Sequence, residues 1–312
     1  MDNVVKKSLE KQGYRFVGNH SAIKLCIWCK RAIKGNNVCY KGNFYGLQTW
    51  RCIQTSISME YCTNRCQFCW RDIAHTKAEW DGPIDDPKEI VDGCIKEHIK
   101  FLQGMKGNKE SSPKFLGESM KPLHFALSLS GEAVMYPRLP ELIKDIHSRG
   151  MTTFLVTNGC NPEMLQRLLD EEEPTQVYLT LAAPDKETYN KTCKPLIDDQ
   201  WERMIKSLEL LTKFKRSTIR MTLTKDLNMI NPEGYAELLK KYPVKFVELK
   251  SAMNVGYASY RLPYESMPRH PEIVEFSNKI CELTGLKIID EKENSRVVLL
   301  MKEDCDDRIM KF

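Results

Sequence analysis

The sequence predicts an α/β fold, a partial (β/α)6 barrel of the TIM type with an N-terminal cysteine-rich extension and C-terminal additions. From residue 52 onward, short apolar or alternating runs typical of strands are each followed by a longer segment typical of a helix. Polar motifs follow several of these runs at the point where the strand ends. Repeated βα units form a parallel sheet whose sites lie at the carboxyl ends of the strands. Because there are six units rather than eight, we expect the barrel to stay open on one side.

The expected elements alternate along the chain. The strands are expected at 52–60, 123–129, 152–157, 176–181, 217–223 and 245–250. The helices are expected at 86–103, 139–149, 162–170, 199–214, 232–241 and 271–284. Asp86 and Pro87 suit the N-cap and first position of the first helix, and Gly285 suits the end of the last. An amphipathic helix ended by Gly13 begins the chain, and runs at 286–290 and 295–301 predict a hairpin.

We expect three parts in this chain of 312 residues. Residues 1–51 form the basic, cysteine-rich extension, 52–256 the barrel core, and 257–312 a loop, helix and hairpin packed on that core. No cleavable apolar leader or run of membrane-spanning length is present, which predicts a cytoplasmic protein without a membrane partner. Twelve cysteines in such a protein indicate metal or redox chemistry rather than disulfides.

Positive charge is concentrated near the N-terminus. The net charge is +5, yet the segment from Lys11 to Met59 has no Asp or Glu and carries eight Lys and Arg, which leaves −3 for the rest. A basic lobe on a slightly acidic body is typical of a protein that binds a phosphate-rich partner, although a solvated basic face without a partner has the same composition. The lysine-rich stretch 104–121 is a second candidate for phosphate contact, expected on the opposite side of the barrel mouth.

Three cysteines follow the first strand in the sequence CTNRCQFC, at Cys62, Cys66 and Cys69. Thiolates are the soft ligands that iron–sulfur clusters require, and three of them leave one iron of a 4Fe–4S cluster open. A structural zinc site that lacks its fourth ligand is the alternative.

A second group of cysteines lies upstream, at Cys26, Cys29, Cys39 and Cys52. A zinc ion would use all four, whereas a second cluster with an open iron would use three and leave Cys29 free. The spacing alone leaves both open.

The C-x3-C-x2-C spacing resembles the signature of the radical S-adenosylmethionine (SAM) enzymes, whose open iron chelates SAM. Ser130, Gly131 and Glu132 resemble the family's Gly-Glu motif, which meets the SAM amino group. Thr157 and Asn158 resemble its third-strand ending near the cofactor. Thr180, or Asp185, matches the segment that approaches the ribose, and 247–256 the one that frames the adenine.

The cysteine sets taken together with CYKGNFYG, SGEAVMYP, TLAAPDKETY and VELKSAMNVGYASYRLPY resemble the tRNA 4-demethylwyosine synthase family over most of the chain. The resemblance implies two 4Fe–4S clusters, with Cys62, Cys66 and Cys69 holding the SAM cluster and Cys26, Cys39 and Cys52 the second. It implies a lyase-type reaction in wyosine biosynthesis, in which N1-methylguanosine beside the anticodon of tRNA-Phe gains a third ring from two carbons of pyruvate.

Further expectations concern pyruvate and electrons. Pyruvate chelates the open iron of the second cluster or forms a Schiff base with a lysine, for which Lys41 is the candidate catalytic residue. A flavodoxin-like domain does not precede the cysteines, so the resemblance implies a separate one-electron donor of flavodoxin or ferredoxin type. We expect a monomer.

The loop 251–270 carries Tyr257, Tyr260 and Tyr264 with Arg261 and Arg269. Interleaved aromatics and arginines suit stacking on splayed bases and phosphate contact, or a lid over SAM. Two other functions remain alternatives. One is a radical SAM activase or maturase that acts on a protein or peptide, and the other is a zinc-bound RNA-binding module.

Overall fold

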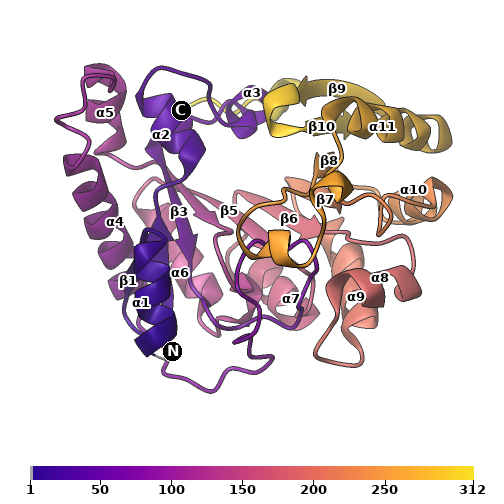
Figure 1. The fold of residues 1–312 in the computed structure, drawn as a ribbon, viewed down its shortest axis with the longest axis horizontal. Helices are drawn as coiled ribbons and strands as arrows, with labels where there is room; N and C mark the ends of the chain where they lie inside the picture. Colours follow the sequence, from indigo (N-terminus) through magenta and orange to yellow (C-terminus); the bar gives the residue numbers. More distant parts are fainter. Residues whose placement is uncertain (1–2) are drawn as a thin grey trace.

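One twisted sheet of ten strands organises the chain (Figure 1), and the computed structural model describes residues 3–312 of it. The strands lie in the sheet in the order β1-β2-β3-β4-β5-β6-β7-β8-β10-β9, which follows the chain except at the last pair. The six strands from β3 to β8 are parallel, and antiparallel strands extend the sheet at both edges. The edges β1 and β9 are not paired with each other, so the barrel is partial, as predicted.

The predicted βα units are confirmed with small shifts at their ends. The parallel strands are β3 (Cys52–Ser56), β4 (His124–Leu127), β5 (Thr152–Thr157), β6 (Gln176–Thr180), β7 (Ser217–Leu223) and β8 (Phe246–Ser251). The predicted helices are α4 (Pro87–Gln103), α6 (Leu139–Ser148), α7 (Pro162–Glu171), α9 (Gln200–Leu211), α10 (Pro232–Lys241) and α11 (His270–Thr284). Helix α1 (Asn3–Lys11) and the hairpin of β9 (Lys287–Lys292) and β10 (Val297–Met301) were also predicted.

Several elements were not predicted, because their runs are too short for a clear period. They are β1 (Tyr14–Val17), β2 (Ser21–Lys24), α2 (Ile27–Ile33), α3 (Tyr40–Tyr45), α5 (Pro113–Ser119) and α8 (Lys186–Cys193). Strand β2 pairs with β3, so the extension continues the sheet of the barrel. The stretch 104–121, expected as a loop, contains α5, which Ser112 caps through its side chain.

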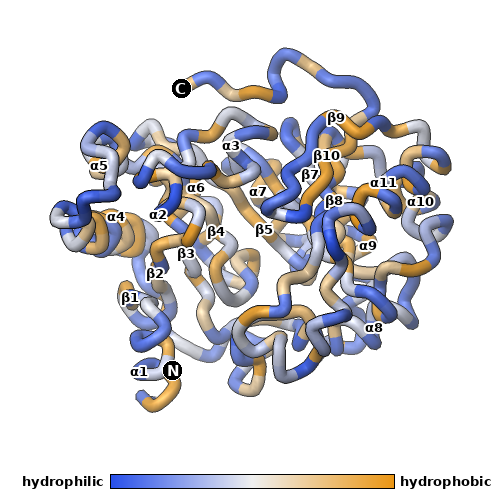
Figure 2. The backbone as a smooth tube through the Cα atoms, turned by 45° about the horizontal axis from the view of Figure 1, so that its top comes forward, coloured by the Kyte–Doolittle hydropathy of each residue, from blue (hydrophilic) through white to orange (hydrophobic). Residues whose placement is uncertain are grey.

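The two faces of the sheet are packed differently. On the convex face, alternate strand residues such as Leu155, Leu179 and Met221 pack against the crossing helices in the main core. On the concave face, Phe154, Tyr178 and Phe246 pack against Tyr40, Phe44 and Tyr45 of α3. Figure 2 shows orange, hydrophobic strands inside and mostly blue segments on the peripheral helices and loops. Helix α3 therefore fills one part of the concave face, and the rest is left for a cavity.

The basic lobe is smaller than its composition suggests. Arg15 forms an ion pair with Glu97, and Lys34 pairs with Glu110. Lys41 lies inside the sheet against the rings of Phe154 and Tyr178. The exposed cations of α2 are Lys30 and Arg31.

Helix α2 contacts α5, so the two lysine-rich segments lie on one side of the molecule (Figure 1), and the expectation that they lie on opposite sides was wrong. Within residues 3–312, none of the helices combines the length and apolar character needed to cross a membrane.

Candidate functional site

A cavity of about 540 Å³ opens at the carboxyl ends of the parallel strands and continues along the concave face. Its lining includes Cys62, Cys66 and Cys69 at one end and Arg220 and Lys250 deeper in the sheet. Between them lie predicted site residues from successive strands, namely Ser130, Gly131, Glu132, Thr157, Asn158 and Thr180. The motifs are therefore brought to one cavity, as the parallel sheet requires.

The loop that carries the three cysteines is fixed by helix α8. The Arg65 amide donates to the carbonyl of Cys193 at 2.9 Å, and the Gln67 amide donates to that of Thr192 at 2.9 Å. The Asn64 side chain donates to the Tyr189 hydroxyl at 2.9 Å. Tyr189 and Cys193 of this helix are buried and also line the cavity beside the cysteine loop.

Residues that follow strands β5 and β4 hold the cysteine loop from its other side. The Asn158 side chain donates to Thr63 Oγ1 at 3.2 Å and points its amide toward Cys62 Sγ at 3.7 Å. Glu132 is buried, and its carboxylate accepts a hydrogen bond from the backbone N–H of Asn158 at 2.7 Å. Burial raises the pKa of Glu132 to about 7, although these donors and Arg71 oppose the rise. Burial therefore favours the neutral carboxyl group, and a positive charge placed beside it would favour the carboxylate.

The backbone at Gly131 lies against the backbone at Ser58, and this close contact fixes the segment that follows β4. Gly131 has φ +74°, and a Cβ there would lie 1.7 Å from the carbonyl oxygen of Ser58. Its neighbour Ser130 exchanges a hydrogen bond with the Tyr14 hydroxyl at 2.9 Å. The glycine is thus required by geometry, since any side chain would push the strand end away from the cysteine loop.

The chemistry around the three thiols fits an iron–sulfur cluster. The guanidinium of Arg71 is surrounded by them, and although burial lowers its pKa, the Cys62 and Cys69 thiolates outweigh that effect and raise it. Burial raises the pKa of Cys62 to about 12, and a hydrogen bond with Cys193 followed by burial raises that of Cys66. Burial therefore favours the protonated forms of Cys62 and Cys66, and binding to iron would supply the energy for proton release.

The thiols fit a single metal ion less well. Within residues 3–312, no three His, Cys, Asp or Glu side chains converge on a point where one ion could sit. A zinc site needs such convergence, whereas the thiolates of a cluster bind different irons.

The upstream cysteines also gather in space. Cys26 and Cys39 directly precede α2 and α3, and Cys52 begins β3; all three are half-buried. Burial raises the pKa of Cys39 to about 11 and that of Cys52 to about 12. Cys29 differs, because it is buried in an apolar cluster and its thiol donates to the Trp50 carbonyl at 3.6 Å. Three thiols are thus placed alike, and the fourth is a packed core residue.

Two lysines approach Cys39 on the concave face. Lys41 Nζ lies 4.4 Å from the centre of the Tyr178 ring, and Lys250 Nζ donates to the Ser295 carbonyl at 2.8 Å. Burial lowers the pKa of both, and nearby Arg220 lowers it further; for Lys250 the pKa falls to about 8. Lys250 lines the cavity. The sequence analysis missed it, although its place at the end of a parallel strand was a usable signal.

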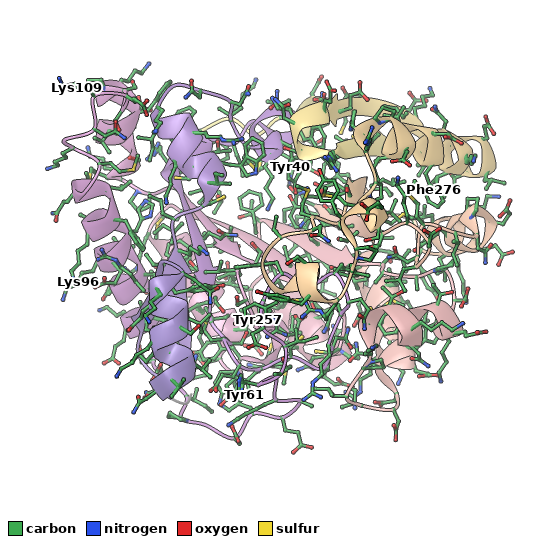
Figure 3. The ribbon with its side chains drawn as sticks, viewed as in Figure 1. Tyr40, Tyr61, Lys96, Lys109, Tyr257 and Phe276 are labelled. Carbon is green, nitrogen blue, oxygen red and sulfur yellow. The ribbon has the colours of Figure 1, made fainter. Side chains whose placement is uncertain are left out.

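The loop 251–270 packs on the cysteine loop. Arg261 donates to the carbonyls of Gln67 and Cys69, and the Tyr257 amide donates to the carbonyl of Trp70 at 2.9 Å. Nε and Nη2 of Arg261 therefore hold the backbone of the cysteine loop, and phosphate contact by Arg261 stays a prediction. Tyr260 and Tyr264 are exposed to 83% and 64%, so large aromatic surfaces remain at the rim. Figure 3 shows Tyr257 between Tyr61, beside the cysteine loop, and Tyr40, beside the upstream set.

One predicted alternative lies outside the site. Asp185 caps α8 by accepting the Thr188 amide at 2.8 Å, and it does not line the cavity, whereas Thr180 does.

Comparisons with known proteins agree with this geometry. Residues 56–239 match the radical SAM superfamily, and residues 242–302 match the family described as wyosine base formation. The chain is 44% identical to the S-adenosyl-L-methionine-dependent tRNA 4-demethylwyosine synthase of Pyrococcus horikoshii, covering 98% of this chain and 91% of that protein. It is 37% identical to the synthase of Methanocaldococcus jannaschii, covering 96% of both. A solved structure of TYW1 with a lysine-pyruvate adduct bound has a TM-score of 0.89 and 35% identity, covering 99% of each chain.

Proposed function

The chain belongs to the tRNA 4-demethylwyosine synthase family of radical SAM enzymes, and from this we propose that it condenses N1-methylguanosine of tRNA-Phe with pyruvate to form 4-demethylwyosine. The observation that carries the proposal is the cavity, which joins the cysteine loop to Lys250, one of the two lysines near Cys39. A radical source and an electrophilic co-substrate would thus face one another across a space that holds one base.

We assign the SAM site to the strand ends. Cys62, Cys66 and Cys69 would hold the 4Fe–4S cluster, which with SAM supplies a radical able to abstract hydrogen. Glu132 is placed to accept the SAM amino group, and its pKa near 7 means that a bound cation would favour its charged form. Gly131, with Ser130 beside it, permits close backbone approach. Asn158 holds the cysteine loop, Thr157 hydrogen-bonds Glu132, and Thr180 would lie within reach of the ribose.

We assign a second 4Fe–4S cluster to Cys26, Cys39 and Cys52. Their similar half-buried positions support three ligands, and the hydrogen-bonded, buried Cys29 supports a structural role for the fourth cysteine.

A lysine would hold pyruvate as an imine beside this cluster. Both Lys41 and Lys250 lie close to Cys39 and have lowered pKa values, so either supplies a neutral amine more readily than an exposed lysine does. The TYW1 structure with its lysine-pyruvate adduct supports this route. Reduction of the adduct with borohydride, followed by peptide mass spectrometry, identifies which lysine is used.

The RNA would enter over α2 and the loop 251–270. Lys30 and Arg31 are exposed on α2, and Tyr260 and Tyr264 offer rings on which a flipped base or its neighbours can stack. We further propose that a one-electron donor of flavodoxin or ferredoxin type supplies electrons to the enzyme, and that the enzyme acts as a monomer.

The test is an anaerobic reaction of the iron-loaded enzyme with SAM, pyruvate, a reductant and tRNA that carries N1-methylguanosine. We expect the tricyclic nucleoside by mass spectrometry, together with 5′-deoxyadenosine. The matched control is the same tRNA with unmodified guanosine, which lacks the methyl group to be attacked and should give no product. If 5′-deoxyadenosine forms while the nucleosides of the methylated tRNA stay unchanged, the proposal fails and the substrate is of another class, such as a peptide.

A further inference from the structure

Arg220, in the middle of β7, lies in the deep part of the cavity beside the two lysines. One edge of its guanidinium is fixed. Nε and Nη2 donate to Glu248 Oε2 at 3.0 and 2.9 Å, and Nη2 also donates to the Tyr40 hydroxyl at 2.6 Å. Glu248 is fully buried, and its other oxygen accepts the Tyr45 hydroxyl at 2.6 Å. The arginine is therefore held rigidly from behind.

The remaining nitrogen of the guanidinium, Nη1, is available to a ligand in the cavity, which Arg220 lines. The Arg220 side chain is 14% exposed, whereas the Glu248 side chain is fully buried. Across residues 3–312, no side chain or carbonyl accepts a hydrogen bond from Nη1 of Arg220. Its face lies over the Tyr178 ring at 4.5 Å, which fixes the plane. A guanidinium that is held in one plane and has Nη1 free can donate a charge-assisted hydrogen bond to a carboxylate oxygen.

The local charge balance favours an anion. Three basic groups lie together here, the amines of Lys41 and Lys250 and the guanidinium of Arg220. The acidic groups beside them are one carboxyl group, that of Glu248, and the thiols of Cys39 and Cys52. A small anionic ligand would relieve this excess of positive charge in a site with little water.

We propose that Arg220 binds the carboxylate of the 2-oxo acid and so restricts the co-substrate to 2-oxo acids; this rests on the proposed function. The lysine Nζ attacks the adjacent carbonyl carbon, a C=N bond replaces C=O, and the oxygen leaves as water. The carboxylate is unchanged in that step, so Arg220 can hold it from binding until the carbon–carbon bond is broken. Because Arg220 neighbours both lysines, the assignment holds for either one. Arg220 is thus a substrate-binding residue, and Glu248 and Tyr40 are positioning residues.

The test compares pyruvate with pyruvamide, its uncharged analogue, as the carbonyl compound trapped on the enzyme by cyanoborohydride. The concentration that gives half-maximal labelling is read from intact mass. For the wild-type enzyme we expect a value roughly 10- to 100-fold lower for pyruvate, the range of a charge-assisted hydrogen bond. In Arg220→Gln combined with Glu248→Gln, which leaves no unpaired buried charge, the pyruvate value should rise to that of pyruvamide while the pyruvamide value stays the same.

The matched control is Arg216→Gln. Arg216 precedes the same strand but donates to the carbonyls of Asp307 and Arg308 and does not line the cavity, so its replacement should leave both values unchanged. Equal labelling of the wild-type enzyme by pyruvate and pyruvamide would overturn the assignment, and this result needs no variant to fold. A double variant that keeps the preference for pyruvate would overturn it as well. If the assignment alone is wrong, wild-type enzyme still makes the tricyclic nucleoside; if the proposed function is wrong, it does not.

Discussion

Replacement of Gly131 by alanine tests how the strand end fixes the cysteine loop. The new Cβ would lie 1.7 Å from Ser58 O, half of the 3.4 Å at which ordinary contact begins, so backbone must move by about 1.7 Å. Alanine at φ +74° costs about 1–2 kcal/mol, and overpacking of this kind costs about 1–3 kcal/mol. The free energy of unfolding should therefore fall by about 2–5 kcal/mol. Glu132 follows directly, so we expect SAM affinity to fall at least about tenfold.

Two other glycines separate the causes of this effect. Gly150 has φ +72° with nothing within 4 Å of its Cβ position, so Gly150→Ala reports the backbone strain alone, about 1–2 kcal/mol. Gly117 lies within α5 with nothing within 4 Å, so Gly117→Ala should be neutral or stabilise by up to about 1 kcal/mol. Urea unfolding gives the three free energies, and equilibrium dialysis gives SAM binding. If Gly131→Ala matches Gly150→Ala in stability and binds SAM normally, the close approach to Ser58 does not hold the site.

Three further predictions follow from particular contacts. Cys39→Ala should remove about half of the iron, whereas Cys29→Ala should keep it, because the Cys29 thiol is buried and donates to the Trp50 carbonyl. Equal losses in iron analysis would favour a four-thiolate site. Reversal of charge at Lys30 and Arg31 should lower the slope of log affinity for tRNA against log salt concentration by about two units. SAM cleavage in the absence of tRNA should not change. An unchanged slope would exclude α2 from the tRNA interface. Burial lowers the pKa of His98 to about 4. On acidification this histidine is therefore protonated in the unfolded chain before it is protonated in the folded one. The free energy of unfolding should fall below pH 6.5, by about 2 kcal/mol at pH 5. His98→Gln should remove that part of the slope in urea unfolding, and a slope identical to wild type would mean that another group titrates.

The sequence by itself determined the βα repeat and the position of the cysteine loop. Runs such as 152–157 and 217–223 are rich in β-branched and apolar residues, as is typical of strands covered on both faces, so their length is visible locally. Helix starts were visible for the same reason, since Asp86 and Asn231 cap through their own side chains and a proline follows each. The ends of successive strands then had to meet at one edge, which brought Glu132 and Asn158 to the cysteines.

Only the tertiary structure decided which charges are free and which residues face the interior. Arg15 and Lys34 are neutralised by Glu97 and Glu110, partners more than sixty residues away. Arg220 meets Tyr40 across 180 positions, and their contact depends on α3 packing into the concave face. Such pairs carry no local period, because they arise when separate elements bury their polar groups together and each buried group must find a partner. The short helix α8 was missed for a related reason: its eight residues are mostly polar, and contacts with the cysteine loop stabilise it.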